Sequence, residues 1–395
     1  MVRKIKEGVL WVGAIDWSRR LFDELIPLPE GTSYNAYVVR GNERTVLIDT
    51  VDPSKEEELL SNLKEAGIEK IDFIISQHGE QDHSGCIPRV LERFPEARVL
   101  TNKKCKEILQ DLLHIPDEKF RVVEDGEILS LGGKTLEFIL APWVHWPDTM
   151  FTYIREDKIL FTCDFLGSHL ATSDLFAREE EVYAGAKRYY AEIMMPFRAN
   201  IRKHLERLEK YEIELIAPSH GPVYKNPEFI LNAYRRWASD EVGPEVVVAY
   251  VSMHGSTERM VAYLVDELIK RDVRVKLFNL TVTDIGEFAE ALVDAAGIVF
   301  ATPTLLAGPH PLVLYACVLT AALRPKIRFV SIIGSYGWGG RTVDILKNLL
   351  SPLRIDYLPP LLIKGYPGKE DLTSLQILAE KIQERITSQD LGQEM

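Results

Sequence analysis

The amino-acid sequence predicts a two-domain protein of α/β and α+β class, with a four-layer αββα sandwich over residues 1–243 and a doubly wound parallel sheet over residues 244–395. Three patterns lead to this division. The first part mixes short hairpins with helices, which is typical of two packed sheets with helices outside them. The segment 238–244, ASDEVGP, is polar and ends in Gly-Pro, as a domain boundary often does. After it, apolar strands alternate with helices, the pattern of a parallel sheet covered on both faces.

Length and composition restrict the class of protein. A chain of 395 residues has room for two or three domains, and 46% hydrophobic with 27% charged residues is ordinary for a globular protein. The excess of 59 acidic over 47 basic residues argues against a nucleic-acid groove. The most apolar region, residues 295–323, is interrupted by prolines, so we expect no membrane span. The first 17 residues are too polar for a signal peptide, which predicts a cytoplasmic protein.

The cysteines are dispersed, without a C-x-x-C pair or regular spacing. This pattern predicts neither a disulfide framework nor a thiolate metal module, and it fits a reducing cytoplasm. A metal site would therefore be built from histidine and carboxylate side chains. The four residues are Cys86, Cys105, Cys163 and Cys317.

In the first domain, residues 33–39 and 44–49 read as two strands of a hairpin. Residues 54–66 form a helix by their apolar spacing, and the β-branched run 71–76 is short enough for a buried strand. Short strands are expected again at 97–101, 120–123 and 135–139, with a helix that ends near residue 113.

In the second domain, the strands and helices alternate regularly. Strands are expected at 246–251, 273–280, 297–302 and 327–334, and helices at 258–270, 285–292, 312–323 and 341–350. Residues 388–395 are expected to fray.

The stretch HGEQDHSG at residues 78–85 places four side chains able to bind metal within six residues. It directly follows a predicted strand, so these side chains lie on a strand-to-helix loop. Alternate positions can turn His78, Glu80 and Asp82 toward one point. His83 then points elsewhere and would suit a second metal.

Three further candidates, His145, Asp164 and His220, each follow a strand-like run. Taken singly, each has an ordinary alternative: a packed histidine, a turn acid and a cap before Gly-Pro. Together with the first cluster they make seven candidate ligands, which exceeds one tetrahedral ion and predicts two metals sharing a carboxylate. Mixed imidazole and carboxylate ligands suit redox iron or manganese better than structural zinc or calcium.

The H-x-E-x-D-H loop resembles the H-x-H-x-D-H loop of the metallo-β-lactamase fold, with Glu80 in place of the second histidine. With that change, nearly the whole chain resembles the flavodiiron proteins, also called A-type flavoproteins: a metallo-β-lactamase-like domain fused to a flavodoxin-like domain. A carboxylate in place of an imidazole favours a harder, higher-valent ion than zinc. The resemblance implies one iron held by His78, Glu80 and His145, a second held by Asp82, His83 and His220, Asp164 as bridge, and no catalytic residue beyond these ligands.

Three loops of the second domain follow strands at their carboxyl ends, where an open α/β sheet binds cofactors. Hydroxyls and amides at a helix start can hold a phosphate, and two aromatic side chains could line a flavin ring. No G-x-G-x-x-G motif occurs, so FMN is favoured over a dinucleotide, although Gly-rich turns remain the alternative. The candidate FMN residues are Ser252, Met253, His254, Gly255, Ser256, Thr257, Pro303, Thr304, Leu305, Ser335, Tyr336, Gly337, Trp338 and Gly339.

The resemblance also implies an activity, reduction of dioxygen to water, of nitric oxide to nitrous oxide, or of both, at a di-iron centre fed by FMN. It implies a head-to-tail homodimer or dimer of dimers and an external electron donor such as a rubredoxin or a reduced deazaflavin. Two alternatives remain open: a zinc-dependent hydrolase fused to a flavodoxin-like module, and a non-enzymatic flavin electron carrier.

Overall fold

The structure divides into two compact units, Met1–Ala238 and Ser239–Met395. The computed structural model describes the backbone of residues 1–390 and the side chains of residues 1–387. Of the residues expected to fray, 388–390 continue the backbone of α12 (Lys369–Asp390), and 391–395 lie outside the described residues. Within residues 1–390, no helix combines the length and apolar character needed to cross a bilayer.

The first sheet of the first unit has seven strands in the order β1-β2-β7-β8-β9-β10-β11. It is antiparallel up to β8 and parallel from β8 to β11. The strands are β1 (Arg3–Lys6), β2 (Val9–Trp11), β7 (Tyr37–Arg40), β8 (Thr45–Ile48), β9 (Phe73–Ile75), β10 (Arg98–Thr101) and β11 (Phe120–Val122).

The second sheet has five strands in chain order, antiparallel except for the last pair. They are β12 (Ile128–Ser130), β13 (Thr135–Leu140), β14 (Met150–Ile154), β15 (Ile159–Cys163) and β16 (Leu215–Pro218). Two small pairs stand apart: β3 (Ala14–Asp16) with β6 (Thr32–Tyr34), and β4 (Leu21–Phe22) with β5 (Ile26–Pro27).

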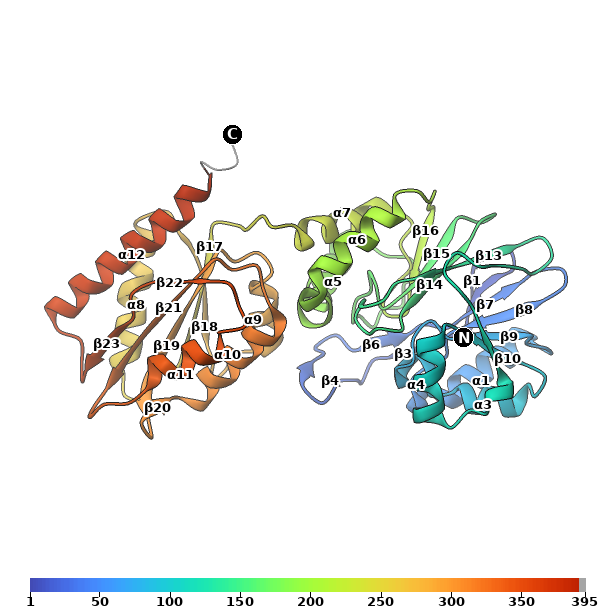
Figure 1. Cartoon of the computed structure of the whole chain (residues 1–395), viewed down its shortest axis with the longest axis horizontal. Helices are drawn as coiled ribbons and strands as arrows, with labels where there is room; N and C mark the ends of the chain where they lie inside the picture. Colours follow the sequence, from blue (N-terminus) through green and yellow to red (C-terminus); the bar gives the residue numbers. More distant parts are fainter. Residues whose placement is uncertain (391–395) are drawn as a thin grey trace. The chain divides into compact units, whose positions relative to one another are not determined.

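Helices cover the outer faces of both sheets, which confirms the predicted αββα sandwich (Figure 1). The first sheet carries α1 (Glu56–Glu65), α3 (Ile87–Arg93) and α4 (Lys103–Leu113), and the second carries α5 (Glu179–Tyr189), α6 (Arg198–Leu208) and α7 (Pro227–Ala238). Shorter helical segments are η1 (Pro53–Lys55), α2 (Gln81–Ser84), η2 (Asp117–Lys119), η3 (Tyr190–Met194) and η4 (Met195–Phe197).

The core between the two sheets fixes the position of one sheet relative to the other. Trp11 and Tyr37 from the first sheet pack with Phe138 and Phe161 from the second, and all four are buried. The rings of Tyr37 and Phe161 lie 4.9 Å apart. This packing brings together the loops that follow β9, β13, β15 and β16.

The strand expected over residues 33–39 is split into β6 and β7 at Asn35. The backbone N–H of Asn35 donates to the Ser219 carbonyl at 2.8 Å, and its Nδ2 donates to the carbonyls of Pro218 and Gly221, both at 2.7 Å. The chain leaves the ladder there because Asn35 braces the loop that carries His220.

The second unit is a parallel sheet in the order β18-β17-β19-β21-β22, with β23 beside β21 and the short β20 antiparallel to β19. This is the doubly wound order of flavodoxin-like folds, as predicted. The strands are β17 (Glu245–Tyr250), β18 (Arg274–Asn279), β19 (Gly297–Leu305), β20 (Gly308–Pro309), β21 (Phe329–Tyr336), β22 (Asp356–Tyr357) and β23 (Leu361–Lys364).

Helices cover both faces of this sheet (Figure 1). One face carries α8 (Ser256–Ile269) and α12, and the other carries α9 (Ile285–Ala291), α10 (Pro311–Leu323) and α11 (Thr342–Leu349). The loops after β17, β19 and β21 therefore meet at the carboxyl edge of the sheet.

Candidate metal centre and flavin cleft

Four side chains from three loops converge at one end of the sandwich: His78, Glu80, His145 and Asp164. Their nitrogen and oxygen atoms all lie within 4.8 Å of one another. Nε2 of His78 is 3.1 Å from Oε2 of Glu80 and 3.8 Å from Oδ2 of Asp164. Nε2 of His145 is 3.4 Å and 3.5 Å from the same two oxygens. These atoms surround a point where one cation could bind.

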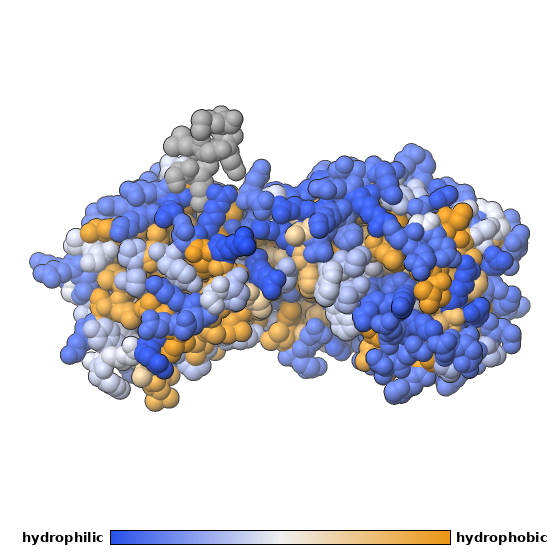
Figure 2. Space-filling model, in the orientation of Figure 1, coloured by the Kyte–Doolittle hydropathy of each residue, from blue (hydrophilic) through white to orange (hydrophobic). Residues whose placement is uncertain are grey.

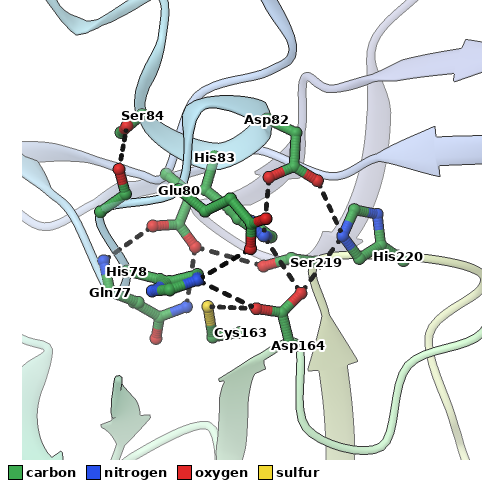
Figure 3. Close-up of polar contacts among 12 residues, drawn as sticks. Gln77, His78, Glu80, Asp82, His83, Ser84, Cys163, Asp164, Ser219 and His220 are labelled. Carbon is green, nitrogen blue, oxygen red and sulfur yellow. Dashed lines mark hydrogen bonds and ion pairs between the residues drawn. The ribbon is translucent and has the colours of Figure 1, made fainter. Parts of the chain in front are cut away.

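A second group forms beside the first from Asp82, His83 and His220, again with its atoms within 4.8 Å. Oδ1 of Asp164 lies 3.1 Å from Nε2 of His83 and 3.2 Å from Nε2 of His220. Oδ1 of Asp82 lies 3.3 Å from Nε2 of His83, and its Oδ2 lies 3.2 Å from Nε2 of His220. Asp164 thus presents one oxygen to each group, as Figure 3 shows.

All seven sequence-predicted ligand candidates meet here, but the alternate-position argument for Asp82 was wrong. The structure groups Asp82 with His83 rather than with His78 and Glu80. The reason is local: α2 begins at Gln81, so the extended spacing ends at Glu80 and the next two side chains turn with the helix.

Oδ1 of Asp82 and Nε2 of His83 are buried and form no hydrogen bond among the described residues; they only lie at ion-pair distances, 3.3 Å from each other and 3.1 Å from His83 Nε2 to Oδ1 of Asp164. Buried polar atoms are nearly always paired, because an unpaired one loses its hydration without compensation. Both atoms face the second group, where a bound cation would satisfy them. The donor set of imidazoles and carboxylates fits two iron ions.

The histidines of the metal-free cluster hold protons tightly. Burial opposes the charged form of His145, but hydrogen bonds to Asp164 and Glu80 outweigh burial and raise its pKa to about 9. Hydrogen bonds to Asp164 and Asp82 likewise outweigh burial and raise the pKa of His220 to about 10. Burial would raise the pKa of Asp164, yet the charge of His83 and hydrogen bonds from His145 and His220 hold it well below its usual value.

Metal binding to the metal-free protein is therefore expected to strengthen as the pH rises from about 7 toward 9. His145 and His220 are protonated below their raised pKa values, and a cation must displace those protons. The affinity should rise about tenfold per pH unit for each proton displaced. Calorimetric titration with ferrous ion, in buffers of different ionisation enthalpy, measures the iron affinity and the number of protons released on binding. A pH-independent affinity without proton release would contradict this expectation.

Residues outside the motif hold the imidazoles in place. Nδ1 of His78 lies 3.2 Å from both carboxylate oxygens of Asp148, which also accepts a 2.7 Å hydrogen bond from Gly79 N–H. Nδ1 of His220 lies 2.8 Å from the carbonyl of Ser33. With Nδ1 engaged in this way, Nε2 of each ring is left to face the cluster.

Two further residues were missed by the sequence analysis. Tyr189 O–H donates to Oδ1 of Asp164 at 3.0 Å. Asp49, 1% exposed, accepts from the backbone and side-chain N–H groups of Gln77 at 2.8 and 2.9 Å, and from Ser219 Oγ at 3.2 Å. Asp49 thereby ties the loop before His78 to the loop before His220.

The two tryptophans beside His145 differ in role. The Trp146 ring packs edge-on against the His78 ring at 4.9 Å and shields it from water. Trp143 stacks on Phe197 instead and remains 49% exposed. A cavity of about 190 Å³ opens beside Glu80 and Asp82 and leads from the surface to the cluster.

In the second unit, a cleft of about 350 Å³ lies at the carboxyl edge of the sheet. Twelve of the predicted FMN residues line it; Gly255 and Gly339 do not, and Leu306 and Gly365 are additional lining residues. Gly255 instead caps α8 with a φ of 84°. Ser252 Oγ accepts from the N–H groups of Gly255 and Glu258, both at 3.2 Å, which shapes the loop that opens α8.

A lactamase-type sandwich with a carboxylate-rich two-metal cluster, joined to a flavodoxin-like unit with an open cleft, defines a class of two-domain metalloflavoproteins. Comparison with known proteins agrees. The family model described as ODP family beta lactamase matches residues 32–221. A nitric oxide reductase of Moorella thermoacetica is 37% identical over 97% of this chain and 98% of its own length. A coenzyme F420H2 oxidase of Methanothermobacter marburgensis is 34% identical over 90% of this chain and 91% of its own length.

Two solved structures match over both units. Rubredoxin oxygen:oxidoreductase of Desulfovibrio gigas has a TM-score of 0.94 at 30% identity and covers 98% of this chain and 99% of its own. The flavodiiron protein of Giardia intestinalis has a TM-score of 0.92 at 31% identity, and the match covers 98% of this chain and 97% of the Giardia chain. The chain belongs to the flavodiiron proteins.

Proposed function

We propose that this protein is an oxidoreductase that reduces dioxygen to water, nitric oxide to nitrous oxide, or both, at a di-iron centre supplied with electrons by FMN. Residues 1–243 carry the metals and residues 244–395 the flavin, in a cytoplasmic protein. The names of the relatives, a nitric oxide reductase and two oxidases, favour this function over a zinc hydrolase or a simple electron carrier.

The observation that carries the proposal is the position of Asp164 between the two groups. Its Oδ2 would bind one ion with His78, Glu80 and His145, and its Oδ1 the other with the second group. The second group consists of Asp82, His83 and His220. Two cations held in this way share one carboxylate and face the same cavity, so a diatomic gas can reach both.

When bound, FMN supplies two electrons and the two ferrous ions one each, which matches the four electrons needed to reduce dioxygen to water. The protein's own residues hold the reaction site. Asp148 orients His78, Trp146 excludes water on one side, and Tyr189 O–H hydrogen-bonds to Asp164. In the second unit, the hydroxyl-rich start of α8 would receive the FMN phosphate, and Tyr336 and Trp338 the ring.

The test is anaerobic reduction of purified protein followed by timed exposure to each gas, with iron, zinc and FMN measured on the same sample. We expect about two iron ions and one FMN per chain and consumption of at least one gas. Stoichiometric zinc with hydrolytic activity and no gas uptake would refute the proposal. Full gas uptake by the doubly substituted H78A/E80A protein would place the reaction elsewhere.

We further propose a head-to-tail homodimer, alone or paired into a dimer of dimers, that brings the flavin of one subunit to the metals of the other. Apolar side chains are exposed on both units (Figure 2). In the first unit, Trp17, Leu25 and Trp143 are 57%, 47% and 49% exposed. In the second unit, Leu306 and Trp338, which line the cleft, are 92% and 90% exposed. Such surfaces favour burial against a partner. A monomer by sedimentation with full turnover would contradict this arrangement.

A further inference from the structure

The cavity that leads to the metal cluster carries more negative charge than the cluster itself uses. Five carboxylates line it: the candidate ligands Glu80 and Asp82, and also Asp23, Glu24 and Asp52. Arg19 is the one cationic side chain among the described residues of this lining. A neutral diatomic gas gains nothing from such charges, whereas a cleft lined by one sign of charge attracts a divalent cation.

Two of these carboxylates, Asp23 and Glu24, stand at the tip of the hairpin between β4 and β5. Both are exposed, with φ of 50° and 52°, and the N–H of Leu25 donates to the Phe22 carbonyl at 3.0 Å to close the turn. A turn with left-handed residues at both central positions usually has Gly at the second, so the turn itself does not favour Glu24. Neither carboxylate makes an ion pair or a side-chain hydrogen bond within the described residues.

The carboxylates of the cavity act on one another. Partial burial, and then the negative charges of Glu80 and Asp82, raise the pKa of Asp23. A cation beside Asp23 would be attracted by all three groups. Asp52 differs, because its Oδ1 accepts hydrogen bonds from the N–H and O–H of Ser54 at the start of η1.

A buried histidine in the same wall is a second, independent observation. His169 lines the cavity and is 8% exposed. Its Nδ1 lies 2.9 Å from Thr32 Oγ1, whereas its Nε2 is buried and has no hydrogen-bond partner among the described residues. Buried polar atoms are nearly always paired. An imidazole nitrogen left over in the wall of an acidic cavity is suited to a metal ion, although His169 belongs to neither ligand group.

We propose that Asp23, Glu24 and His169 form an entry site, which attracts a divalent cation and passes it to the seven candidate ligands. The exposed carboxylates raise the concentration of the cation at the mouth of the cavity, and His169 binds it further in. The transfer exchanges bound water for side-chain ligands and involves no electron transfer. The inference goes beyond the proposed function, because it requires only that the cluster binds a metal, whether iron or zinc.

The test measures metal uptake by the full-length protein after its metals have been removed with a chelator. Cobaltous ion is mixed rapidly with this protein, and stopped-flow quenching of tryptophan fluorescence reports binding, because Trp146 packs against His78. The neutralising variant is D23N/E24Q, since Asn fits a left-handed turn at least as well as Asp. We expect its second-order uptake rate constant to fall at least about fivefold near 0.01 M ionic strength, and less than about twofold near 1 M, where charges are screened.

The matched control is D111N/E118Q, which removes the same charge from the same unit. Asp111 near the end of α4 and Glu118 in η2 are exposed and make no ion pair in the described chain. They lie where the chain returns to the start of β11, at the edge of the sheet opposite the cluster. Uptake by this control should change less than about twofold at either ionic strength.

Two further variants change the entry site in other ways. R19Q removes the cation from the lining and should speed uptake at low ionic strength, which a general loss of structure would not do. H169Q removes an uncharged imidazole ligand and should slow uptake at both ionic strengths, since salt does not screen coordination. The melting temperature of each metal-free variant checks that it is folded.

Several results would overturn the inference. They are unchanged uptake by D23N/E24Q at low ionic strength, an equal loss in D111N/E118Q, or unchanged uptake by H169Q. Normal uptake by D23N/E24Q combined with slower gas reduction would mean that the carboxylates supply protons instead. A changed sedimentation coefficient of D23N/E24Q would assign the turn to the subunit interface.

No gas and no flavin chemistry take part in metal uptake, so the entry site is judged independently of the proposed reductase activity. Gas consumption by the iron-loaded protein provides the separate check. If that consumption is normal while metal uptake does not depend on the turn or on His169, only the entry site is wrong.

Discussion

Replacement of Asp164 with asparagine is expected to empty both halves of the metal centre and to abolish gas reduction, while FMN is retained. Oδ2 of Asp164 faces His145 at 3.5 Å and Oδ1 faces His83 at 3.1 Å. An amide offers one neutral oxygen and one N–H2 group there, so one metal group loses its acceptor and both lose negative charge. Loss of a residue that only supports a ligand costs 10- to 100-fold, so we expect a loss of more than about 100-fold. Measuring the iron content, the FMN content and the rate of oxygen uptake of the variant tests the expected loss of metal and activity and the retention of FMN.

The control for this variant is D125N, since Asp125 is a surface carboxylate paired with Arg207 in the same unit. It should keep its iron and its activity. An Asp164→Asn protein that retains two iron ions per chain would show that Asp164 does not bridge them.

Replacement of Asp148 with alanine is expected to weaken metal binding and gas reduction by about 10- to 100-fold. Asp148 is fully buried and contacts Nδ1 of His78 and the N–H of Gly79. Without it, the imidazole loses its orientation and both N–H groups lose their acceptor. Asp148→Asn keeps an oxygen acceptor but not the charge, so its iron affinity should fall between those of Ala and the unmodified protein.

Iron affinity by chelator competition distinguishes positioning from general destabilisation. If Asp148→Ala lowers the melting temperature but leaves the affinity unchanged, Asp148 serves only the stability of the loop. If Asn and Ala behave alike, the carboxylate charge rather than the contact geometry orients His78.

The clustering of the seven candidate metal ligands was predictable because four of them fall in one short motif and the other three each follow an apolar run. The ends of neighbouring strands in a sandwich lie close together, so residues that follow different strands can meet. The pattern His78-x-Glu80-x-Asp82-His83 is typical of a metal site. The division of the ligands between two ions was implied by resemblance to a family, not by spacing, and the spacing argument for Asp82 failed at the start of α2.

The supporting residues were not predictable in this way. Asp148 stands 70 positions from His78 and belongs to no motif. Its contact depends on the path of the loop between β13 and β14, which sequence periodicity does not describe. Asp49 and Tyr189 likewise reach the cluster through tertiary packing, from a strand end and a helix end.

In the second unit, the regular alternation of strands and helices made residues 246–350 readable, while residues after 350 gave no clear pattern. There, β23 has only four residues and follows two prolines, and the long helix α12 was not predicted. Gly365 in the cleft was missed for that reason, since it follows β23. Leu306 was missed because it lies at a hairpin tip, with φ of 51°, where an apolar side chain is not expected.

The metal cluster draws its residues from both layers of the sandwich: residues 78–83 follow β9 of the first sheet, while His145, Asp164 and His220 follow strands of the second. Bound cations would therefore act as a cross-link between the sheets at the edge where the loops meet. Ligands that bind only the folded state stabilise it in proportion to their occupancy. The melting temperature of this unit would then depend on the iron supply as well as on the packing of its core. In a cell short of iron, the same chain would be less stable.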